Sequence, residues 1–437
     1  MASTYLSRTF STGNRKKWTF SAWVKRSGVS GDMELFGRAD GTDNGSSEFF
    51  ILSDGRLGFG RWNDYILRTT RKLRDGSGWY HLVLRVDTTL STADDRARIY
   101  INGVQETDFE ARTNMAQNYD FAINSNVAHL IGGIDYSGTV QRYMNGLMSH
   151  VHFCDGYSYD ASAFGSTDST TGEWKINTSP SVSYGTTGFT ILKDGMTITD
   201  QSANSNNWTL GGGTLTKTED NPSNVFATIN ALDNYRFGGT FTNGNNRVVS
   251  VSSVESYWTS TLGASSGKYY WEVKIDSSGS GKDFVGIADK VAGATDFTPY
   301  SGNNKMRSYY GSTGVSVVGS TGTAFGATFG TGDIIGVAMD LDNHKIYYSK
   351  NGAWQGSGNP TTGANGLAID TSPASGFYYA QAANIHNTAS TFKTNFGNGY
   401  FGTDAVSSAG SNASGIGIFE YDVPTGFTAL STKGLNL

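Results

Sequence analysis

The stretch FFILSDGRLGFG at residues 49–60 contains two apolar runs joined by Asp54-Gly55. An Asp-Gly or Asn-Gly pair between two such runs is a strong signal for a two-residue β-hairpin turn. The same signal predicts hairpin turns at Asn102-Gly103, Asn145-Gly146, Asp194-Gly195 and Asn351-Gly352. Turns that recur in this way along a chain are typical of a β-sandwich.

Side-chain alternation outside these turns also indicates strands. In WTFSAWV (18–24), Trp18, Phe20 and Ala22 alternate with residues that would face a different environment. No segment shows the 3.6-residue periodicity of an amphipathic helix, and a chain of 437 residues is long enough for two large β domains. The sequence therefore predicts an all-β fold with two β-sandwich (jelly-roll) domains in tandem.

The boundary between the two domains is expected in a segment of different composition. Residues 160–225 are rich in Gly, Ser, Thr and Asn, with one short strand expected at Phe189–Leu192 that returns to the first domain. Gly211–Gly213 and Pro222 are expected to interrupt any regular element. We therefore predict a first domain at 1–215, with a trailing connector, and a second domain at 216–437.

Composition excludes several classes of protein. The 57 glycines show no three-residue period, which excludes collagen, and a charged content of 16% is too low for a long coiled coil. A single cysteine, Cys154, excludes a disulfide-stapled scaffold. The net charge of −5 gives no footprint for nucleic acid, and no apolar run is long enough to cross a membrane as a helix.

A basic cluster follows the first hairpin and comprises Arg61, Arg68, Arg71, Lys72 and Arg74. One interpretation is a solvated hairpin face. The other is attraction to an anionic glycan or to an acidic partner surface. Binding that weakens as salt rises would favour the second interpretation, because salt screens exposed charges.

Aromatic residues in polar segments are candidate ligand contacts, because an exposed ring can stack on a sugar or anchor a protein interface. Trp62 and Tyr65 lie in GRWNDYI (60–66), beside the basic cluster, and Trp354 follows the turn at 351–352. Tyr309 and Tyr310 occupy KMRSYYGSTG (305–314), which we interpret as a loop. The predicted ligand-binding residues are Arg61, Trp62, Tyr65, Arg68, Tyr309, Tyr310 and Trp354.

One acidic motif has the spacing of laminarinase-like glycoside hydrolases. In ETDFE (106–110), Glu106, Asp108 and Glu110 would share one face of a strand. A retaining pair needs carboxyl groups about 5–5.5 Å apart, whereas residues four apart on a flat strand are about 13 Å apart. We therefore expect a polar strand face and no catalytic residues.

Two motifs offer metal-ligand types. His150, His152 and Cys154 in HVHFCD (150–155) would share one strand face, but three residues on a flat strand fit the tetrahedral geometry of zinc poorly. Asp40 and Asp43 in RADGTDNG (38–45) either form an ordinary turn or hold calcium. The sequence leaves the calcium question open, and we expect no other metal and no cofactor.

Each half of the chain resembles a known β-sandwich family. The first half resembles the laminin-G/concanavalin A-like jelly roll in FSAWVK (20–25), GWYHLVLRVD (78–87), RIYINGV (98–104) and MNGLMSHVHFCDG (144–156). The second half resembles the SPRY family in SGKYYWEVKID (266–276), DFVGIAD (283–289), GDIIGVAMDLDNHKIYYSKNGAWQG (332–356), FKTNFG (392–397) and VPTGFTAL (423–430). The SPRY resemblance implies a domain that binds protein partners through loops at one end and performs no catalysis.

The combination of these two domains resembles virion proteins of tailed bacteriophages. It implies a non-enzymatic tail- or fibre-associated adhesin that is made in the host cytoplasm and functions in the virion as a homo-oligomer. Such a protein binds host surface glycan and other virion proteins, with no nucleic acid and no membrane insertion.

Two alternatives remain open for the function. One is a capsid decoration or head-fibre protein that binds mainly other virion proteins. The jelly-roll motifs begin within the first residues, so we expect no anchoring module or heptad shaft before them, which favours this alternative. The other is a polysaccharide depolymerase built on the acidic motif at 106–110.

Overall fold

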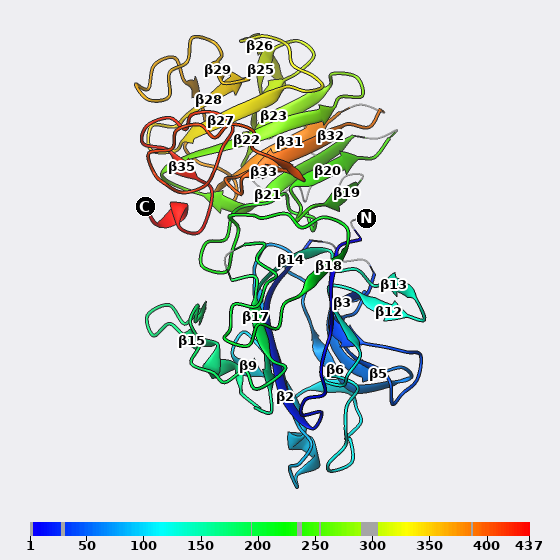
Figure 1. The fold of residues 1–437 in the computed structure, drawn as a ribbon. Coiled ribbons are helices and arrows are strands. Elements are labelled where there is room, and N and C mark those ends of the chain that lie inside the picture. The colour runs from blue at the N-terminus through cyan, green and yellow to red at the C-terminus, as the bar shows by residue number, and fades with distance from the viewer. Residues whose placement is uncertain are drawn as a thin grey trace. The chain divides into compact units, whose positions relative to one another are not determined.

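The computed structural model describes residues 3–27, 31–193, 195–233, 238–252, 255–289, 305–385 and 388–437. The chain divides into two compact units, Met1–Lys217 and Thr218–Leu437, two residues beyond the predicted boundary. Both units are built from layered β-strands (Figure 1), and the described residues hold no α-helix. The helices among these residues are short 3₁₀-helices, and none is long and apolar enough to span a membrane. The prediction of an all-β chain of tandem β-sandwiches is confirmed.

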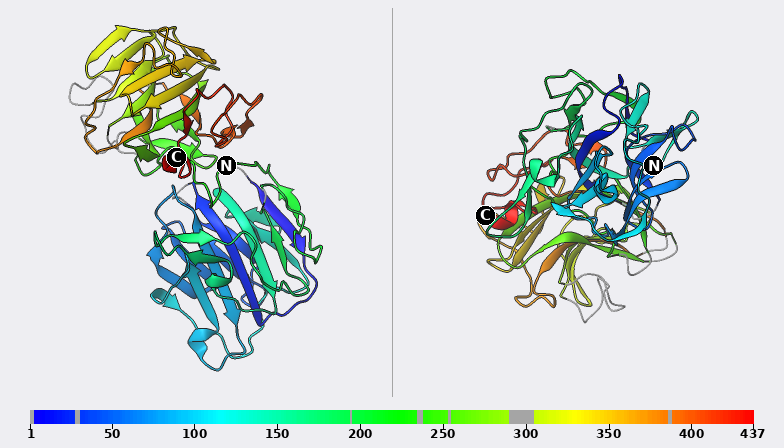
Figure 2. Two further views of the ribbon diagram at one scale, coloured as in Figure 1. Left: turned by 90° about the vertical axis from the view of Figure 1, so that its left-hand side faces the viewer. Right: turned by 90° about the horizontal axis from the view of Figure 1, so that it is seen from below.

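Unit 1 contains two antiparallel sheets that face each other across a common core (Figure 2). Sheet A has the order β10 (Phe109–Arg112), β6 (Asp64–Lys72), β5 (Arg56–Arg61), β4 (Ser47–Ile51), β3 (Met33–Arg38), β11 (Ala128–Ile131), β1 (Tyr5–Thr9), β18 (Thr209–Gly212). Sheet B has the order β17 (Phe189–Ile191), β14 (Gly146–Asp155), β2 (Lys17–Arg26), β7 (Tyr80–Asp87), β8 (Ala97–Ile101), β9 (Val104–Gln105). The separate hairpins are β12 (Ile134–Tyr136) with β13 (Thr139–Gln141), and β15 (Gly165–Thr167) with β16 (Trp174–Ile176).

The alternation of side chains along β2 explains how the two sheets of unit 1 pack against each other. Trp18 and Phe20 point into the core between the sheets, where the Trp18 ring lies 5.9 Å from that of Phe59 on sheet A. The alternate residues Thr19 and Ser21 on the opposite face are buried as well. They are covered because the chain after β14 folds back over the outer face of sheet B, where Thr19 accepts a hydrogen bond from the backbone N–H of Tyr159.

The predicted hairpin turns have different outcomes. The turns at Asp54-Gly55, Asn102-Gly103 and Asn351-Gly352 are confirmed, each joining two paired strands. Their glycines have positive φ values of 91°, 81° and 81°, which glycine adopts without the steric penalty of a Cβ. The turn at Asn145-Gly146 is wrong, because Gly146 begins β14 and that strand pairs with β2 and β17. Asp194 lies outside the described residues.

The segment predicted as a trailing connector belongs to the fold of unit 1. The expected short strand at Phe189–Leu192 is confirmed as β17, which pairs with β14. The expected interruption at Gly211–Gly213 is wrong, because Thr209–Gly212 forms β18 at the edge of sheet A. A Cβ on Gly211 would lie 2.2 Å from the ring of Tyr5, so the glycine lets that ring rest against the strand.

Unit 2 also contains two sheets. Sheet C has the order β19 (Gly239–Thr242), β20 (Arg247–Ser250), β32 (Thr391–Asn395), β22 (Lys268–Ser277), β27 (Ile334–Asp340), β28 (Lys345–Lys350), β29 (Ala353–Trp354), with β30 (Leu367–Ala368) beside β28 and β35 (Thr428–Ala429) beside β22. Sheet D has the order β21 (Ser256–Ala264), β31 (Tyr378–Asn384), β23 (Asp283–Ala288), β24 (Arg307–Tyr310), β25 (Val315–Val318), β26 (Thr321–Ala324). The remaining short elements are β33 (Tyr400–Phe401), β34 (Asp404–Ala405) and the 3₁₀-helices η1 (Ala93–Asp95), η2 (Ala161–Ala163) and η3 (Gly434–Asn436).

A buried glutamate ties the C-terminal segment of unit 2 to sheet C. The Glu272 carboxylate on β22 accepts hydrogen bonds from the backbone N–H groups of Glu420 and Tyr421, at 2.9 and 2.8 Å. It also accepts from the Asn395 amide at 3.2 Å and from the Tyr270 hydroxyl at 3.1 Å. Burial raises the pKa of Glu272 to about 7, and the four donors oppose that shift. These bonds hold the segment 406–423 over the outer face of the sheet.

We predict that each unit folds alone. Each has its own buried aromatic core, with Trp18 in unit 1 and Trp258 in unit 2 fully buried. Separately expressed fragments 1–217 and 218–437 should each give a β-type circular dichroism spectrum and a cooperative thermal transition. A fragment that is soluble only in the presence of the other would contradict this division.

Candidate functional site

The face of sheet A that points away from the core carries a group of aromatic and charged side chains. On β5, Gly58 leaves room for the Phe50 ring of β4, since a Cβ there would lie 2.8 Å from that ring. The Arg142 guanidinium, after the β12–β13 hairpin, lies over the rings of Phe50 and Tyr136, at 5.1 and 5.3 Å. We call Phe50, Trp62, Tyr65, Arg68, Tyr136 and Arg142 the outer-face cluster.

Three of the predicted ligand-binding residues belong to this cluster. Trp62, in the turn between β5 and β6, is 42% exposed, and its ring lies 4.9 Å from that of Tyr136 in a T-shaped contact. The half-buried Tyr65 lies 6.2 Å from the Phe50 ring, and the Arg68 guanidinium lies 5.1 Å over Tyr65. Trp62 is therefore linked to Tyr65 and Arg68 through the other side chains of the cluster.

Arg61 is predicted for the same site, but its side chain makes contacts elsewhere in unit 1. Its guanidinium forms an ion pair with Asp64 at 2.9 Å and lies 5.8 Å from the centre of the Tyr119 ring. Neither of these partners belongs to the outer-face cluster. Because side chains alternate along a strand, Arg61 at the end of β5 and Trp62 in the following turn diverge.

The predicted contacts in unit 2 are buried or packed. Tyr309 and Tyr310 do not lie in a loop: they end strand β24, with exposed fractions of 0% and 8%. Tyr310 stacks on Phe284 with ring centroids 4.2 Å apart. Trp354, in β29, is half-buried against the core and contacts the Tyr270 ring at 6.4 Å. The loop interpretation is wrong because a short polar stretch around two aromatic residues, as in this segment, is compatible with a strand as well as with a loop.

Two glutamates that the sequence interpretation missed lie beneath the β12–β13 hairpin. Glu48 accepts a hydrogen bond from Arg142 at 2.8 Å and another from the Tyr136 hydroxyl. Glu34 on β3 is fully buried and makes no side-chain hydrogen bond of normal geometry among the described residues. A signal for both was present, because each lies in an otherwise apolar strand, MELFGR or SEFFI, at a position that alternation places opposite the core.

The electrostatics of these two carboxyls differ. Burial raises the pKa of Glu34 well above its usual range, and the neighbouring Glu48 carboxylate adds to the shift, while Arg142 opposes it. Burial also raises the pKa of Glu48, but the Tyr136 hydroxyl and Arg142 favour its charged form. The uncharged form is therefore favoured more strongly at Glu34 than at Glu48.

The basic cluster is neutralised by acidic neighbours. Arg68 forms an ion pair with Glu110 on β10 at 3.1 Å, and Arg71 forms one with Glu106 at 3.0 Å. Lys72 lies 3.7 Å from Asp54. Arg74 is exposed. The arrangement fits the interpretation of a solvated hairpin face better than that of an open basic patch.

The acidic motif at 106–110 does not gather its carboxyls at one point. Glu106 precedes β10 and is buried in its pair with Arg71. Glu110, inside β10, instead contacts Arg56 and Arg68 at 3.0 and 3.1 Å. Glu106 and Glu110 thus have different guanidinium partners, and these ion pairs stabilise the fold.

The candidate metal ligands are also engaged in other contacts. Asp40 accepts hydrogen bonds from the backbone and hydroxyl of Thr42, and Asp43 accepts one from the backbone N–H of Asn63. His150 occupies a bulge in β14, with a φ of 49°. Within the part of the chain that the structure describes, no three His, Cys, Asp or Glu side chains are placed to share a metal ion.

A buried serine–histidine pair lies on the outer face of sheet B. His81 Nε2 is 2.9 Å from the Ser21 hydroxyl, and the Trp174 indole N–H donates to His81 Nδ1 at 3.0 Å. Since Nδ1 accepts, the ring proton must reside on Nε2, which then donates to Ser21. His81 therefore cannot take a proton from Ser21, and the pair fastens the β15–β16 hairpin to the sheet.

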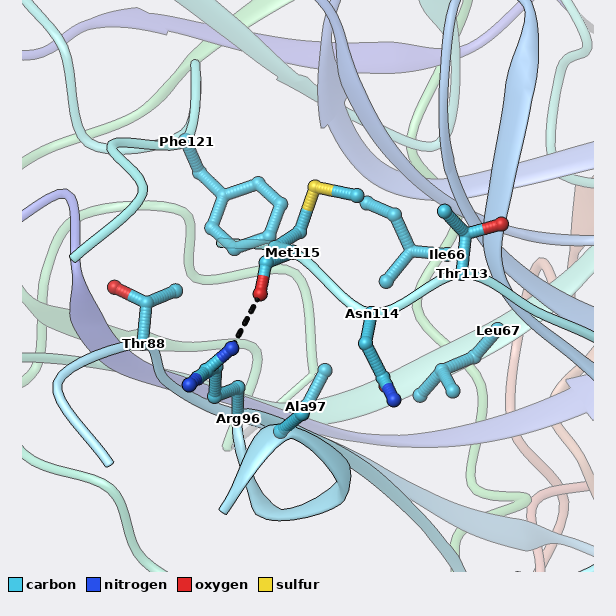
Figure 3. A pocket seen from close by; sticks show the side chains of 10 residues that line it. Ile66, Leu67, Thr88, Arg96, Ala97, Thr113, Asn114, Met115 and Phe121 are labelled. Carbon is cyan, nitrogen blue, oxygen red and sulfur yellow. Dashed lines mark hydrogen bonds between the residues drawn. The ribbon is translucent and has the colours of Figure 1, made fainter. Parts of the chain in front are cut away.

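The pocket beside β6 and η1 is too small for an organic ligand. It has space for little more than one water molecule. Figure 3 shows it between Phe121, Met115 and Ile66, with Arg96 donating a hydrogen bond to the Met115 carbonyl at 2.8 Å. It is a gap in the packing at one end of unit 1.

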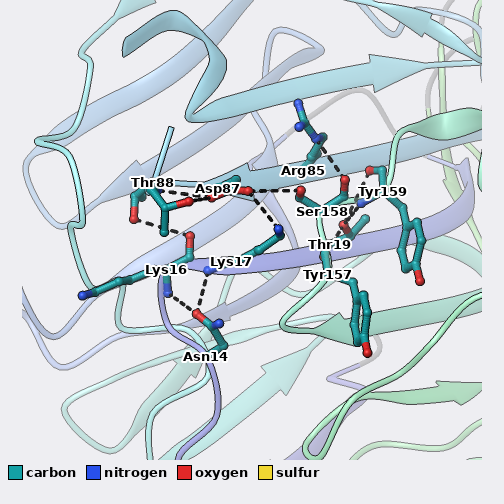
Figure 4. A network of polar contacts seen from close by, with 11 residues as sticks. Asn14, Lys16, Lys17, Thr19, Arg85, Asp87, Thr88, Tyr157, Ser158 and Tyr159 are labelled. Atoms are coloured by element: carbon teal, nitrogen blue, oxygen red, sulfur yellow. Dashed lines mark hydrogen bonds and ion pairs between the residues drawn. The ribbon is translucent and has the colours of Figure 1, made fainter. Parts of the chain in front are cut away.

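A second exposed aromatic residue lies at sheet B, away from the cluster. Tyr157 is 42% exposed and its ring is nearly parallel to that of Tyr159, with centroids 5.7 Å apart. Thr19 and Arg85 hold the intervening backbone by hydrogen bonds to the carbonyls of Tyr157 and Ser158, at 2.9 and 3.1 Å (Figure 4). Tyr157 therefore matches Trp62 in exposure but not in surroundings.

Family comparisons match each unit separately. A model of the concanavalin A-like lectin/glucanases superfamily matches residues 2–158, and a model of the SPRY domain matches residues 268–392. The chain carries a concanavalin A-like domain and an SPRY domain. Unit 1 contains the first of these matched regions and unit 2 contains the second.

Individual relatives match the SPRY domain. Ran-binding protein 9 and Ran-binding protein 10 of Danio rerio are each 37% identical over 95 residues, which are 22% of this chain and 16% of those proteins. The chain thus spans about one sixth of the length of the curated relatives it matches. The solved SPRY domain of human HERC1 is 19% identical with a TM-score of 0.32, and covers 38% of this chain and 96% of its own. Stonustoxin is 20% identical with a TM-score of 0.29, and the match covers 39% of this chain and 27% of the stonustoxin chain.

Because three histidines of the concanavalin A-like domain are buried, we predict that this domain loses stability as the pH falls. Burial lowers the pKa of His81 and of His129 to about 3, and that of His152 well below its usual value. A group whose folded pKa is depressed contributes stability that is present above its unfolded pKa, about 6.5, and is lost as pH falls toward the folded value. Each histidine contributes a slope of about 1.4 kcal/mol per pH unit. Glu34, with a raised pKa, opposes this trend above pH of about 4.5.

The variant His129→Gln tests the sign and size of this effect. Urea denaturation of fragment 1–217 between pH of about 6.5 and 4.5 should show a slope smaller by about 1.4 kcal/mol per pH unit than the unmodified fragment shows. An unchanged slope would contradict the buried, neutral state of His129. The matched comparison is His344→Gln in fragment 218–437, where the side chain is exposed.

Proposed function

We propose that this chain is a non-enzymatic virion component of a tailed bacteriophage, a tail- or fibre-associated adhesin. In this proposal the concanavalin A-like domain binds carbohydrate on the host surface, and the SPRY domain binds other virion proteins. The protein would be made in the host cytoplasm and would work as a homo-oligomer within the particle, where several weak sites add up to firm attachment. The pairing of these two domain types in one chain supports the proposal.

The observation that carries carbohydrate binding is the exposed Trp62 ring at the outer-face cluster. Its ring lies 4.9 Å from that of Tyr136 at an interplanar angle of 66°, and 42% of the side chain stays open to solvent. An indole packed in this way offers apolar surface to the ring of a sugar, and it loses little side-chain freedom on binding. Within the same cluster, Arg142 lies over Tyr136 and Arg68 over Tyr65, and both can donate hydrogen bonds to sugar hydroxyls.

The absence of enzymatic activity is part of the same proposal. A glycosidase needs two carboxyl groups that both reach the substrate. Glu34 and Glu48 are 0% and 3% exposed beneath the β12–β13 hairpin. Glu106 and Glu110 are each engaged by a guanidinium. These environments support a binding role for the face, and a depolymerase is the less favoured candidate.

The alternative function is a capsid decoration or head-fibre protein that binds mainly other virion proteins. The share of the chain given to a protein-binding type of domain favours it, since the SPRY match alone covers residues 268–392. Antibody labelling of phage particles distinguishes the two functions: label on the tail or fibres supports the adhesin, and label spread over the capsid supports decoration.

Replacement of Trp62 tests the proposed site. In the full-length chain, Trp62→Ala should weaken binding to purified host surface polysaccharide about 5- to 30-fold, because the stacking surface is lost at about 1–2 kcal/mol. Tyr157→Ala is the control, since Tyr157 is equally exposed but lies outside the outer-face cluster. Affinity would be measured on the immobilised polysaccharide, and adsorption to host cells would be measured alongside it.

Thermal melting of the same variants separates binding from packing. The melting temperature of Trp62→Ala should remain close to that of the unmodified protein, because much of the side chain is already in solvent. Lower stability together with unchanged adsorption would make Trp62 a packing residue and would place the binding site elsewhere.

A further inference from the structure

We propose that the outer-face cluster selects an uncharged polysaccharide chain over an acidic one. The inference rests on the proposed function, because it names the ligand class of the same site. It replaces the sequence-based hypothesis that free arginines attract an anionic glycan. The evidence is the ion pairing of Arg56, Arg68, Lys72 and Arg142 on this face.

Two carboxylates, Glu110 and Asp54, are shared among Arg56 on β5 and Arg68 and Lys72 on β6. Glu110 Oε2 lies 3.0 Å from Arg56 Nε and 3.1 Å from Arg68 Nε. Asp54 contacts Arg56 as well and lies 3.7 Å from Lys72 Nζ. Their side-chain exposures of 19% to 29% show that the three cations are partly withdrawn from solvent within these pairs.

The arginine at the hairpin is paired in the same way. Arg142 Nη1 lies 2.8 Å from Glu48, and its Nε lies 3.8 Å from Asp32. Glu34 is buried beside Glu48, and burial raises its pKa well above the usual range. Arg56, Arg68, Lys72 and Arg142 therefore each have an acidic neighbour.

The charges in the ion pairs of this face cancel. The pairs contain four cations and four anions: Arg56, Arg68, Lys72 and Arg142 against Asp32, Glu48, Asp54 and Glu110. An acidic sugar would have to compete with these carboxylates for their guanidinium groups. It would also bring a like charge close to them, which is unfavourable.

A neutral sugar meets no such penalty. Its hydroxyl groups can accept hydrogen bonds from the guanidinium N–H groups and donate to the carboxylate oxygens that are already in place. Its ring face can rest on Trp62, and none of the existing ion pairs has to break. The site thus presents donors, acceptors and an apolar surface without a net charge.

The test uses host surface polysaccharide separated by anion exchange into a neutral and an acidic fraction. Part of the acidic fraction is carboxyl-reduced, which converts uronic acids to neutral sugars on the same backbone. The full-length chain should bind the neutral and the carboxyl-reduced material, and Trp62→Ala should lose most of this binding. Affinity should stay nearly constant from about 0.1 M to about 1 M salt, although the Debye length falls from about 10 Å to about 3 Å.

The variant Glu110→Gln provides a gain-of-function arm. Glu110 is 43% exposed on an edge strand, so its replacement should leave the fold intact while it removes the nearest carboxylate of Arg68 and leaves Asp54 as the acidic neighbour of both Arg56 and Arg68. This variant should bind the acidic fraction at least several-fold more tightly than the unmodified chain, and salt should weaken that binding. Glu173→Gln, at an exposed position on a different part of unit 1, changes the net charge equally and should have no effect.

The outcomes separate the two proposals. Binding of the unmodified chain that depends on Trp62 but is confined to the acidic fraction, and is lost on carboxyl reduction, would overturn the inference and leave the proposed adhesin function standing. Binding that does not depend on Trp62 would overturn the inference alone, because it would place the site elsewhere, and binding to neither fraction would overturn both proposals.

Discussion

Each unit of this chain depends on aromatic side chains packed between two antiparallel sheets. In unit 1, Phe20 of sheet B stacks on Phe36 of sheet A, with ring centroids 4.9 Å apart and planes inclined by 3°. In unit 2, Trp258 of sheet D meets Phe392 of sheet C at 5.9 Å. Such contacts fix the register of the strands, because a shift of one residue would turn every inward ring to the outside. The positions between the rings are thereby assigned to the outer faces.

The outer faces of sheets A and B in unit 1 are covered by other chain segments to different extents. This difference decides where a ligand can bind. The chain after β14 covers the outer face of sheet B, with Trp174 bonded to His81 and Tyr159 bonded to Thr19. On sheet A, the β12–β13 hairpin covers Glu34 and leaves Trp62 beside it in solvent. The open part of the outer face of sheet A therefore has an exposed aromatic ring, Trp62, at its margin.

Buried carboxyl groups are accommodated in two ways. Glu272 in the SPRY domain receives four hydrogen bonds, which compensate part of the cost of removing its charge from water. At Glu34 in the concanavalin A-like domain the backbone of Phe49 and the charge of Arg142 favour the carboxylate, but burial outweighs them and favours the uncharged acid. The first arrangement secures a chain segment.

The sequence by itself determined the all-β class, the two tandem domains and most hairpin turns, because alternation and Asn-Gly or Asp-Gly turns are local properties of the chain. It also placed Tyr65 and Arg68 near each other, since neighbouring residues on one hairpin stay close in any fold. Only the tertiary structure decided which charges are free. Arg68 meets Glu110 because β10 pairs with β6, and Tyr310 is buried because β24 lies between β23 and β25. Contacts of this kind join residues far apart in the chain, so their formation depends on how the strands are ordered in the sheet, which no local pattern specifies.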